Sequence, residues 1–319
     1  MAGKPKNGLS EVRAWVEKRC PGRFLLNEPL APHTWYRIGG PAALLVYPQD
    51  QAELVDLLRE CRQCDMPTFL MGDGANLLVA DEGFDGVVIC LMRFLRAITS
   101  RGNTVTAQAG ALLRDAVYFS ERRGLSGIEC LAGIPGTIGG ALTMNAGIDS
   151  GDIGAAVESV SLLDESLRVR TLSRADIDFG YRSAPQLQDR VLLECTLRCG
   201  AGNEPEMRAA RMDLLRRRAA KQPLEYGSCG SVFKRPAGRF VGRMVEESGL
   251  KGTQRGDAMI SDKHAGFIVN LGCATAQDVL YLIRLVRDEI RKRYGIALEP
   301  EVRFLGIEAS DQRPATSLK

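Results

Sequence analysis

A stretch of unusually bare backbone lies in the middle of this chain. The sequence GIPGTIGGALTMNAG, residues 133–147, contains five glycines, one proline and no charged side chain. A second glycine turn, GDGANL at residues 72–77, follows a strand-like segment. Glycine lets backbone amides approach a ligand without obstruction by a side chain. Each stretch is therefore either a tight turn or part of a site for a phosphate-bearing ligand.

Neither stretch has an established nucleotide fingerprint. GDGANL lacks the third glycine of G-x-G-x-x-G, and GIPGTIGG has neither that spacing nor the G-K-[ST] of a P-loop. A Rossmann dinucleotide domain and a P-loop ATPase are excluded on those criteria. Taken one at a time, the two stretches are equally well explained as structural turns.

Composition narrows the class of protein. With 319 residues, 45% of them hydrophobic and 25% charged, the chain is long enough for two or three packed domains. The net charge of +3 is too small for a nucleic-acid binder but is compatible with a small anionic ligand. No apolar run reaches the ~18 residues of a membrane helix, and no signal-peptide core is present. We expect a cytoplasmic protein without membrane or nucleic-acid partners.

The cysteines indicate a reducing environment. There are nine, an odd number, scattered through apolar segments, which favours reduced thiols. Cys61 and Cys64 form a lone C-x-x-C, and zinc would require a second pair of ligands that the two histidines do not readily supply. We therefore expect no metal site.

Hydrophobic periodicity predicts strands and helices interspersed along the chain. A capping box at residues 50–53 begins one helix, and a second box at residues 275–278 begins a long helix with Val279, Ile283, Val286 and Ile290 on one face. Before residue 200, the expected elements are helices at 10–19 and 112–122, strands at 67–71, 86–91, 104–109 and 191–199, and a hairpin over 164–166.

A shift in composition at residues 200–205 precedes a basic helix at 206–221, and we place a domain boundary there. The remainder is predicted to be a smaller α/β unit. It contains the strand pair AMIS and AGFIVN and a final strand in LEPEVRFLG.

Eight motifs then occur in a characteristic order. They are HTWYRIGGPA, GDGANLLVADEGFDGVVI, GIPGTIGGALTMNAG, FGYRS, KQPLEYGSCGSVFKRP, SGLKG, KHAGFIVN and LEPEVRFLG. From about His33 to Gly306 the chain resembles the UDP-N-acetylenolpyruvylglucosamine reductase family, in its shorter second type.

The resemblance implies an α+β fold. An FAD-binding domain of the vanillyl-alcohol oxidase (PCMH) type, built of two α+β subdomains, is followed by a smaller α/β substrate-binding domain. The expected segments are an N-terminal helical segment 1–32, the FAD-binding domain 33–202 with subdomains of about 33–98 and 99–202, the substrate domain 203–308 and a mobile tail 309–319.

The implied cofactors are noncovalent FAD and NADPH as the hydride donor. In this family, main-chain amides hold the FAD pyrophosphate, which is the chemistry that both glycine stretches offer. The matching positions are Gly72, Asp73, Gly74, Ala75, Asn76, Leu77, Pro135, Gly136, Thr137, Gly139, Gly140, Ala141 and Asn145.

The implied reaction reduces UDP-N-acetylglucosamine enolpyruvate to UDP-N-acetylmuramate, a peptidoglycan precursor. Hydride addition from flavin N5 leaves a carbanion beside a carboxylate, which calls for a cation, an acid and a proton donor. Arg182 matches the family's stabilising arginine, Ser231 its proton donor and Glu301 its assisting glutamate. Without the resemblance, the simpler interpretations are a surface arginine, a turn serine and an ion-paired glutamate.

The implied substrate-binding residues are Tyr181, Lys221, Lys234, Arg235 and His264. Cations near Ser231 suit a diphosphate, although Lys221 is also explained as a solvated helix end. Residues 216–218 are three consecutive arginines, so they point to different sides of a helix and not all can face one ligand.

Three positions depart from the family pattern. Ala75 and Ala184 stand where serine is usual, and Gly227 stands where proline is frequent. Two alternative functions stay open: an alcohol or hydroxy-acid oxidase of the same flavin fold, and a flavin- or UDP-sugar-binding regulator without catalysis. We expect a monomer.

Overall fold

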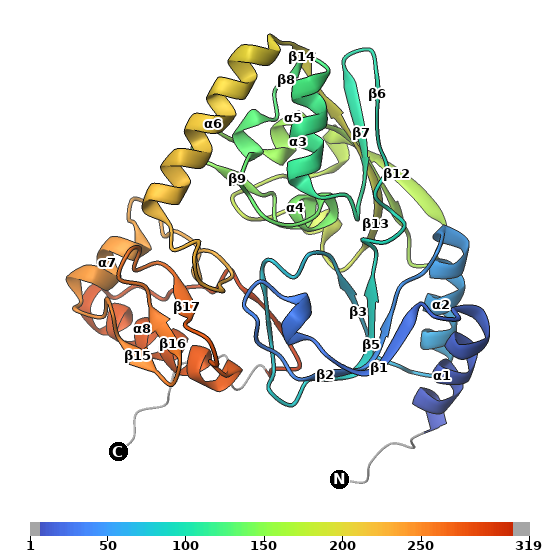
Figure 1. Ribbon diagram of the computed structural model, residues 1–319, viewed down its shortest axis with the longest axis horizontal. Coiled ribbons are helices and arrows are strands. Elements are labelled where there is room, and N and C mark those ends of the chain that lie inside the picture. The colour runs from blue at the N-terminus through green and yellow to red at the C-terminus, as the bar shows by residue number, and fades with distance from the viewer. Residues whose placement is uncertain (1–6, 309–319) are drawn as a thin grey trace. The chain divides into compact units, whose positions relative to one another are not determined.

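The computed structural model describes residues 7–308, which divide into two compact units (Figure 1). Unit 1 comprises residues 7–26, 44–73 and 86–218, and unit 2 comprises residues 27–43, 74–85 and 219–308. The sequence-based domains are continuous stretches, whereas these units interleave along the chain. The predicted tail 309–319 lies outside the described residues. Within those residues, no helix combines the length and apolar character needed to cross a membrane.

The core of unit 1 lies against a five-stranded antiparallel sheet in the order β12-β11-β13-β7-β6. Its strands are β6 (Ile98–Arg101), β7 (Thr104–Gln108), β11 (Val157–Leu163), β12 (Val169–Ser173) and β13 (Val191–Arg198). The hairpin expected over 164–166 is confirmed, because β11 pairs with β12. Apolar residues of β7, β11 and β13 pack with α3 (Leu113–Arg122), α4 (Ile138–Thr143) and α5 (Ile153–Ala156).

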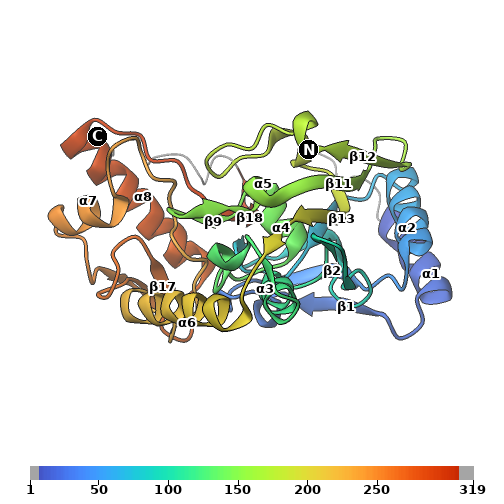
Figure 2. The same ribbon diagram turned by 90° about the horizontal axis from the view of Figure 1, so that it is seen from above.

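A second sheet has the order β1-β2-β5-β3, formed by β1 (Phe24–Pro29), β2 (Pro41–Val46), β5 (Phe84–Cys90) and β3 (Thr68–Met71). The chain passes between the units within β1, β2 and β5. In unit 1, helices α1 (Asn7–Arg19) and α2 (Gln51–Gln63) lie side by side (Figures 1 and 2). The predicted apolar face of α2 is buried, with Leu54, Leu57, Leu58 and Cys61.

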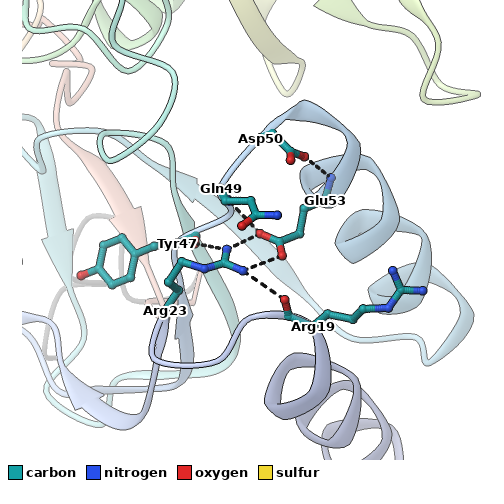
Figure 3. Close-up of polar contacts among 6 residues, drawn as sticks. All are labelled: Arg19, Arg23, Tyr47, Gln49, Asp50 and Glu53. Atoms are coloured by element: carbon teal, nitrogen blue, oxygen red, sulfur yellow. Dashed lines mark hydrogen bonds and ion pairs between the residues drawn. The ribbon is translucent and has the colours of Figure 1, made fainter.

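The predicted capping box of α2 forms only by half (Figure 3). The Asp50 carboxylate accepts from the Glu53 N–H at 2.8 Å, as expected. The Glu53 carboxylate accepts instead from the Gln49 N–H at 2.7 Å and from the Arg23 guanidinium. The reciprocal part of the expectation is wrong because the partly buried Arg23, 30 positions away in the sequence, binds this carboxylate more strongly than one amide can.

Helix α6 (Glu204–Lys221) lies beside α3 in both views (Figures 1 and 2). The pair is held by Arg211 and Glu121, whose atoms Nε and Oε2 are 2.6 Å apart and whose side chains are 10% and 7% exposed. Residues 204–218 of α6 therefore belong to unit 1. The remaining short elements of this unit are β8 (Leu125–Ser126), β9 (Gly147–Ile148), β10 (Gly151–Asp152) and β14 (Gly200–Ala201).

Unit 2 packs a long helix on small sheets. Strands β15 (Gln254–Arg255), β16 (Ala258–Ile260) and β17 (Ile268–Asn270) form an antiparallel sheet, and β4 (Leu77–Val79) runs parallel to β18 (Arg303–Leu305). The unit also contains α7 (Val241–Glu247). Helix α8 (Ala276–Tyr294) begins with the predicted capping box, and its predicted apolar face is buried, so both expectations are confirmed. The Asp81 carboxylate additionally accepts from the Ala276 N–H at 2.7 Å.

Candidate active site

The two glycine stretches meet within unit 1. A Cβ atom on Gly72 would lie 2.5 Å from Thr137 Oγ1, so only glycine allows this approach. Thr137 is 3% exposed, and its hydroxyl accepts from the Gly140 N–H at 3.3 Å. The Gly139 N–H donates to the Ala109 carbonyl at 2.8 Å. The loop is therefore fixed to the end of β7 by backbone bonds.

This loop has amides left over for a ligand. Within residues 7–308, the N–H groups of Gly136 and Thr137 donate to no protein acceptor. Gly140 is exposed, and the nearest atom to a Cβ built there is 3.6 Å away. Adjacent unpaired amides next to open space suit a phosphate group. The residues present in unit 1 thus fit the pyrophosphate of FAD.

The continuation of the first glycine stretch lies in unit 2. Gly74 has φ +63°, and a Cβ there would lie 2.3 Å from the His33 carbonyl oxygen. The amides of Ala75 and Asn76 donate to no acceptor in the described part of the chain. The Asn76 side chain donates to the Glu301 carbonyl at 2.9 Å. This half of the loop is therefore tied to a predicted catalytic segment.

Ser231 and Glu301 come together on paired backbone segments of unit 2. The Val232 N–H donates to the Gly266 carbonyl at 3.0 Å, and the Glu301 N–H donates to the Val232 carbonyl at 2.7 Å. Ser231 also pairs with Phe267 in an isolated bridge. Ser231 is exposed and Glu301 is partly buried. The structure thus places a hydroxyl and a carboxyl group on adjacent strand-like segments.

The predicted cations have different surroundings. Lys221 is exposed at the end of α6. Lys234 is ion-paired with Glu299, so its charge is partly compensated, and the Arg235 guanidinium carbon lies 4.7 Å from the centre of the Phe240 ring.

His264 supports the backbone beside Ser231. Its Nδ1 accepts from the Gly266 N–H at 3.1 Å, and its ring contacts the Phe267 ring edge-on at 4.9 Å. Burial lowers the pKa of His264. A neutral ring with Nδ1 as acceptor carries its proton on Nε2. The structure therefore gives His264 a structural hydrogen bond, while the substrate contact implied for it stays a prediction.

Arg182 lies on a turn of unit 1. Gly180 and Ser183 close this turn with two backbone hydrogen bonds of 2.9 and 3.2 Å. Arg182 has φ +52°, and its guanidinium carbon is 5.3 Å from the centre of the Tyr181 ring, a side chain that is 54% exposed. Arg182 is thus in a different unit from Ser231 and Glu301.

Sequence reasoning did not single out Arg218 from its arginine run. A Cβ on Gly133 would lie 3.3 Å from Arg218 Nε, so the guanidinium group packs against the start of the glycine stretch. Burial lowers the pKa of Arg218, and no hydrogen bond joins this side chain to residues 7–308. The sequence does contain one indication of this position. Arg218 follows Arg211 by seven residues, a spacing that puts both side chains on one face of α6.

The structure accommodates two departures from the family pattern. Ala184 is fully buried in the apolar core of unit 1, where a serine hydroxyl would need a partner. At Gly227 a Cβ would lie 2.9 Å from the Tyr36 carbonyl oxygen, so this position is crowded. Ala75 is partly buried, and nothing in the structure explains its alanine.

Comparisons with known proteins identify the family of this chain. Residues 42–172 match the family model described as FAD binding domain, and residues 222–305 match the one described as UDP-N-acetylenolpyruvoylglucosamine reductase, C-terminal domain. The chain is 41% identical to the reductase of that name from Clostridium perfringens over 282 residues, 88% of this chain and 92% of that protein. It is 44% identical to the one from Levilactobacillus brevis over 292 residues, 91% and 96% of the two chains.

A solved structure is also similar. The crystal structure of UDP-N-acetylenolpyruvylglucosamine reductase from Thermus caldophilus has a TM-score of 0.77 and 35% sequence identity, covering 88% of this chain and 98% of that chain. The matched FAD-binding domain and the amide-rich loops define an FAD-binding flavoprotein of the α+β class. The chain belongs to the UDP-N-acetylenolpyruvoylglucosamine reductase family.

Proposed function

We propose that this protein reduces the enolpyruvyl double bond of UDP-N-acetylglucosamine enolpyruvate, giving UDP-N-acetylmuramate, with NADPH as reductant. The main support is the backbone hydrogen bond from Glu301 to Val232, the residue after Ser231, which places the two segments side by side in a chain of this family. FAD, when bound, would supply the redox chemistry that links NADPH to the sugar nucleotide. We further propose that the protein acts as a monomer in the cytoplasm.

Cofactor binding is assigned to unpaired groups of the backbone. The amides of Gly136, Thr137, Ala75 and Asn76 would hold the FAD phosphates, because each lacks an acceptor among residues 7–308. Arg218 would add a positive charge whose burial strengthens its attraction to an anion. The remaining predicted contacts in the two glycine stretches stay proposals of the same kind, except Asn145. Its side-chain amide is 2% exposed and already bonds two backbone groups, so we do not propose that it binds FAD.

The sugar nucleotide would be held by cations and an aromatic ring. Lys221, Lys234 and Arg235 would bind its diphosphate, with Tyr181 and His264 as further contacts. A diphosphate could share Lys234 Nζ with Glu299, because the ammonium group has three donors and can bond both.

The chemical step is assigned to three side chains. The Arg182 guanidinium would bind the substrate carboxylate with two parallel hydrogen bonds and stabilise the negative charge that develops on it. A protonated Glu301 would donate a hydrogen bond to the same charge. Ser231 Oγ would give its proton to the substrate carbon and regain one from solvent, to which it is exposed.

Stopped-flow absorbance tests this function. The purified protein should be yellow, NADPH should bleach the flavin under anaerobic conditions, and UDP-N-acetylglucosamine enolpyruvate should restore the colour. A colourless protein after reconstitution with FAD, or a reduced flavin that the sugar nucleotide fails to reoxidise, would exclude the proposal. Rapid reoxidation by oxygen would instead favour the oxidase alternative. Stable binding without turnover would favour the regulator.

A further inference from the structure

Asn145 joins three separate segments of unit 1. It lies at the end of the glycine stretch with φ +41° and is 2% exposed. Its Oδ1 accepts from the Gly154 N–H at 3.0 Å, and its Nδ2 donates to the Gly180 carbonyl at 2.8 Å. Both ends of the side-chain amide are thus engaged with backbone groups. Gly180 opens the turn that carries Arg182.

A second contact holds the same turn. A Cβ on Gly154 would lie 2.5 Å from Phe179 Cγ, so Phe179 packs directly on this glycine. Arg174 donates to the Gly154 carbonyl at 3.0 Å, and its guanidinium carbon is 5.0 Å from the centre of the Phe179 ring. Gly154 is therefore a fixed platform, and both Asn145 and Phe179 connect it to Gly180.

The platform matters because the turn is strained. A non-glycine residue in the left-handed region, such as Arg182, is strained and persists only where its surroundings impose it. The two bonds between Gly180 and Ser183 are internal to the turn and do not anchor it to the rest of unit 1. The bond from Asn145 to the Gly180 carbonyl does.

We propose that Asn145 is a positioning residue that sets the orientation of Arg182, a role that rests on the proposed function of Arg182. Asn145 acts on the step in which the sugar nucleotide is reduced, and it acts through the turn. Substitution there should leave hydride transfer from NADPH to FAD unchanged.

The test is a double-mutant cycle on the two half-reactions. Asn145→Asp keeps the size of the side chain but replaces the donor to the Gly180 carbonyl. We expect it to slow reoxidation of reduced flavin by UDP-N-acetylglucosamine enolpyruvate by ~10–100-fold, the order expected for a misplaced catalytic group. Flavin reduction by NADPH and the Kd for FAD, measured by fluorescence titration, should stay within about twofold of the unmodified protein. Neither depends on the orientation of Arg182, which is the catalytic group that this substitution misplaces.

The Arg182→Ala background separates the possible outcomes. If Asn145 acts through Arg182, adding Asn145→Asp to Arg182→Ala causes no further slowing. Equal slowing in both backgrounds, or weakened FAD binding as the main effect, would overturn the positioning role. If Arg182→Ala alone does not slow reoxidation, the proposed function of Arg182 fails instead.

Two further variants guard against a trivial loss of folding. Ser120→Ala removes another buried hydrogen bond of unit 1, from a hydroxyl 1% exposed to the Leu125 carbonyl. It should lower the melting temperature without changing either half-reaction. Phe179→Leu loosens the turn while leaving Asn145 in place, and it should slow the same half-reaction selectively. If Asn145→Asp does not fold, an unchanged reoxidation rate in Phe179→Leu would overturn the proposal.

Discussion

The two units hold their proposed catalytic groups by different means. In unit 2, Ser231 and Glu301 lie on segments that are joined to each other and to Gly266 by backbone hydrogen bonds. In unit 1, Arg182 lies on a turn anchored by the side chain of Asn145. Backbone pairing survives most substitutions, whereas a side-chain anchor disappears with one. Substitution of Ser231 should therefore remove chemistry without loss of structure, whereas substitution of the anchor Asn145 should affect both.

The largest effect is expected for Ser231→Ala in unit 2. Loss of the proton donor should slow reoxidation of reduced flavin by the sugar nucleotide by ~10²–10⁴-fold. The melting temperature and the rate of flavin reduction by NADPH should not change, because the pairing at Val232 uses backbone atoms only. Stopped-flow and thermal-melt measurements on one preparation check both statements. A clear drop in melting temperature would break the comparison.

The next effect concerns a side-chain anchor of unit 1. Glu121→Gln leaves Arg211 without its buried partner and should lower the free energy of unfolding by about 3 kcal/mol. Hydrogen bonds from Arg211 hold the pKa of Glu121 below its ordinary value, so the pair stabilises the protein above that ordinary pKa and weakens as the pH falls through the lowered one.

The control for this variant is Asp213→Asn on the same helix. This change removes an exposed ion pair in which the Arg217 and Asp213 side chains are 70% and 51% exposed. It should lower the free energy of unfolding by no more than about 0.5 kcal/mol. Urea denaturation measures both variants. Equal costs would mean that burial does not distinguish the two pairs.

A glycine of unit 1 offers a change that should affect the ligand alone. Gly140→Val points a side chain into open space beside the unpaired amides, so FAD affinity should fall at least ~10-fold, about 1.4 kcal/mol, with little change in the apoprotein's melting temperature. Gly272→Val is the matched control, since a Cβ there would also have its nearest neighbour at 3.6 Å. Flavin fluorescence titration measures the affinities. Unaltered FAD binding in Gly140→Val would contradict the proposal that this loop binds FAD.

The smallest effect tests a side chain that supports the backbone pairing beside Ser231 in unit 2. Burial lowers the pKa of His264, so the unfolded chain binds the proton more readily than the folded protein. Stability should fall as the pH decreases below about 6.5, the ordinary histidine pKa. His264→Asn retains an acceptor for the Gly266 N–H and should flatten this dependence. Melting temperatures between pH 8 and 5 give the comparison, and parallel curves would contradict it.

Local patterns were sufficient to predict many elements of the fold. Apolar spacing and a capping box predicted α8 and its buried face, because those signals lie within one helix. Residues 204–218 of α6 were expected in a second domain, but Arg211 attaches the helix to Glu121 in unit 1. No composition signal marks that pair, which joins positions 90 residues apart. The interleaving of the units has no local signal either.

The candidate site likewise contains residues that local sequence motifs predict and residues that only the folded structure identifies. The ordered motifs predicted the glycine stretches, Ser231 and Glu301 as site residues, because each motif carries its own residues. The contacts of Asn145 could not be predicted, since both partners are backbone groups of glycines and leave no side-chain pattern. Arg218 was obscured by two neighbouring arginines, and only its position on the folded helix distinguishes it.

The interleaved chain limits how this protein can be divided or recombined. Unit 2 takes Tyr36 and Leu78 into its core, and the Tyr36 hydroxyl donates to the Ile268 carbonyl at 2.8 Å. A fragment spanning only the matched C-terminal domain, residues 222–305, lacks both residues. Such a fragment would expose the apolar surface that they cover. Neither unit can be excised as a continuous cassette, so exchanging substrate domains between homologues requires grafting three separate stretches of chain.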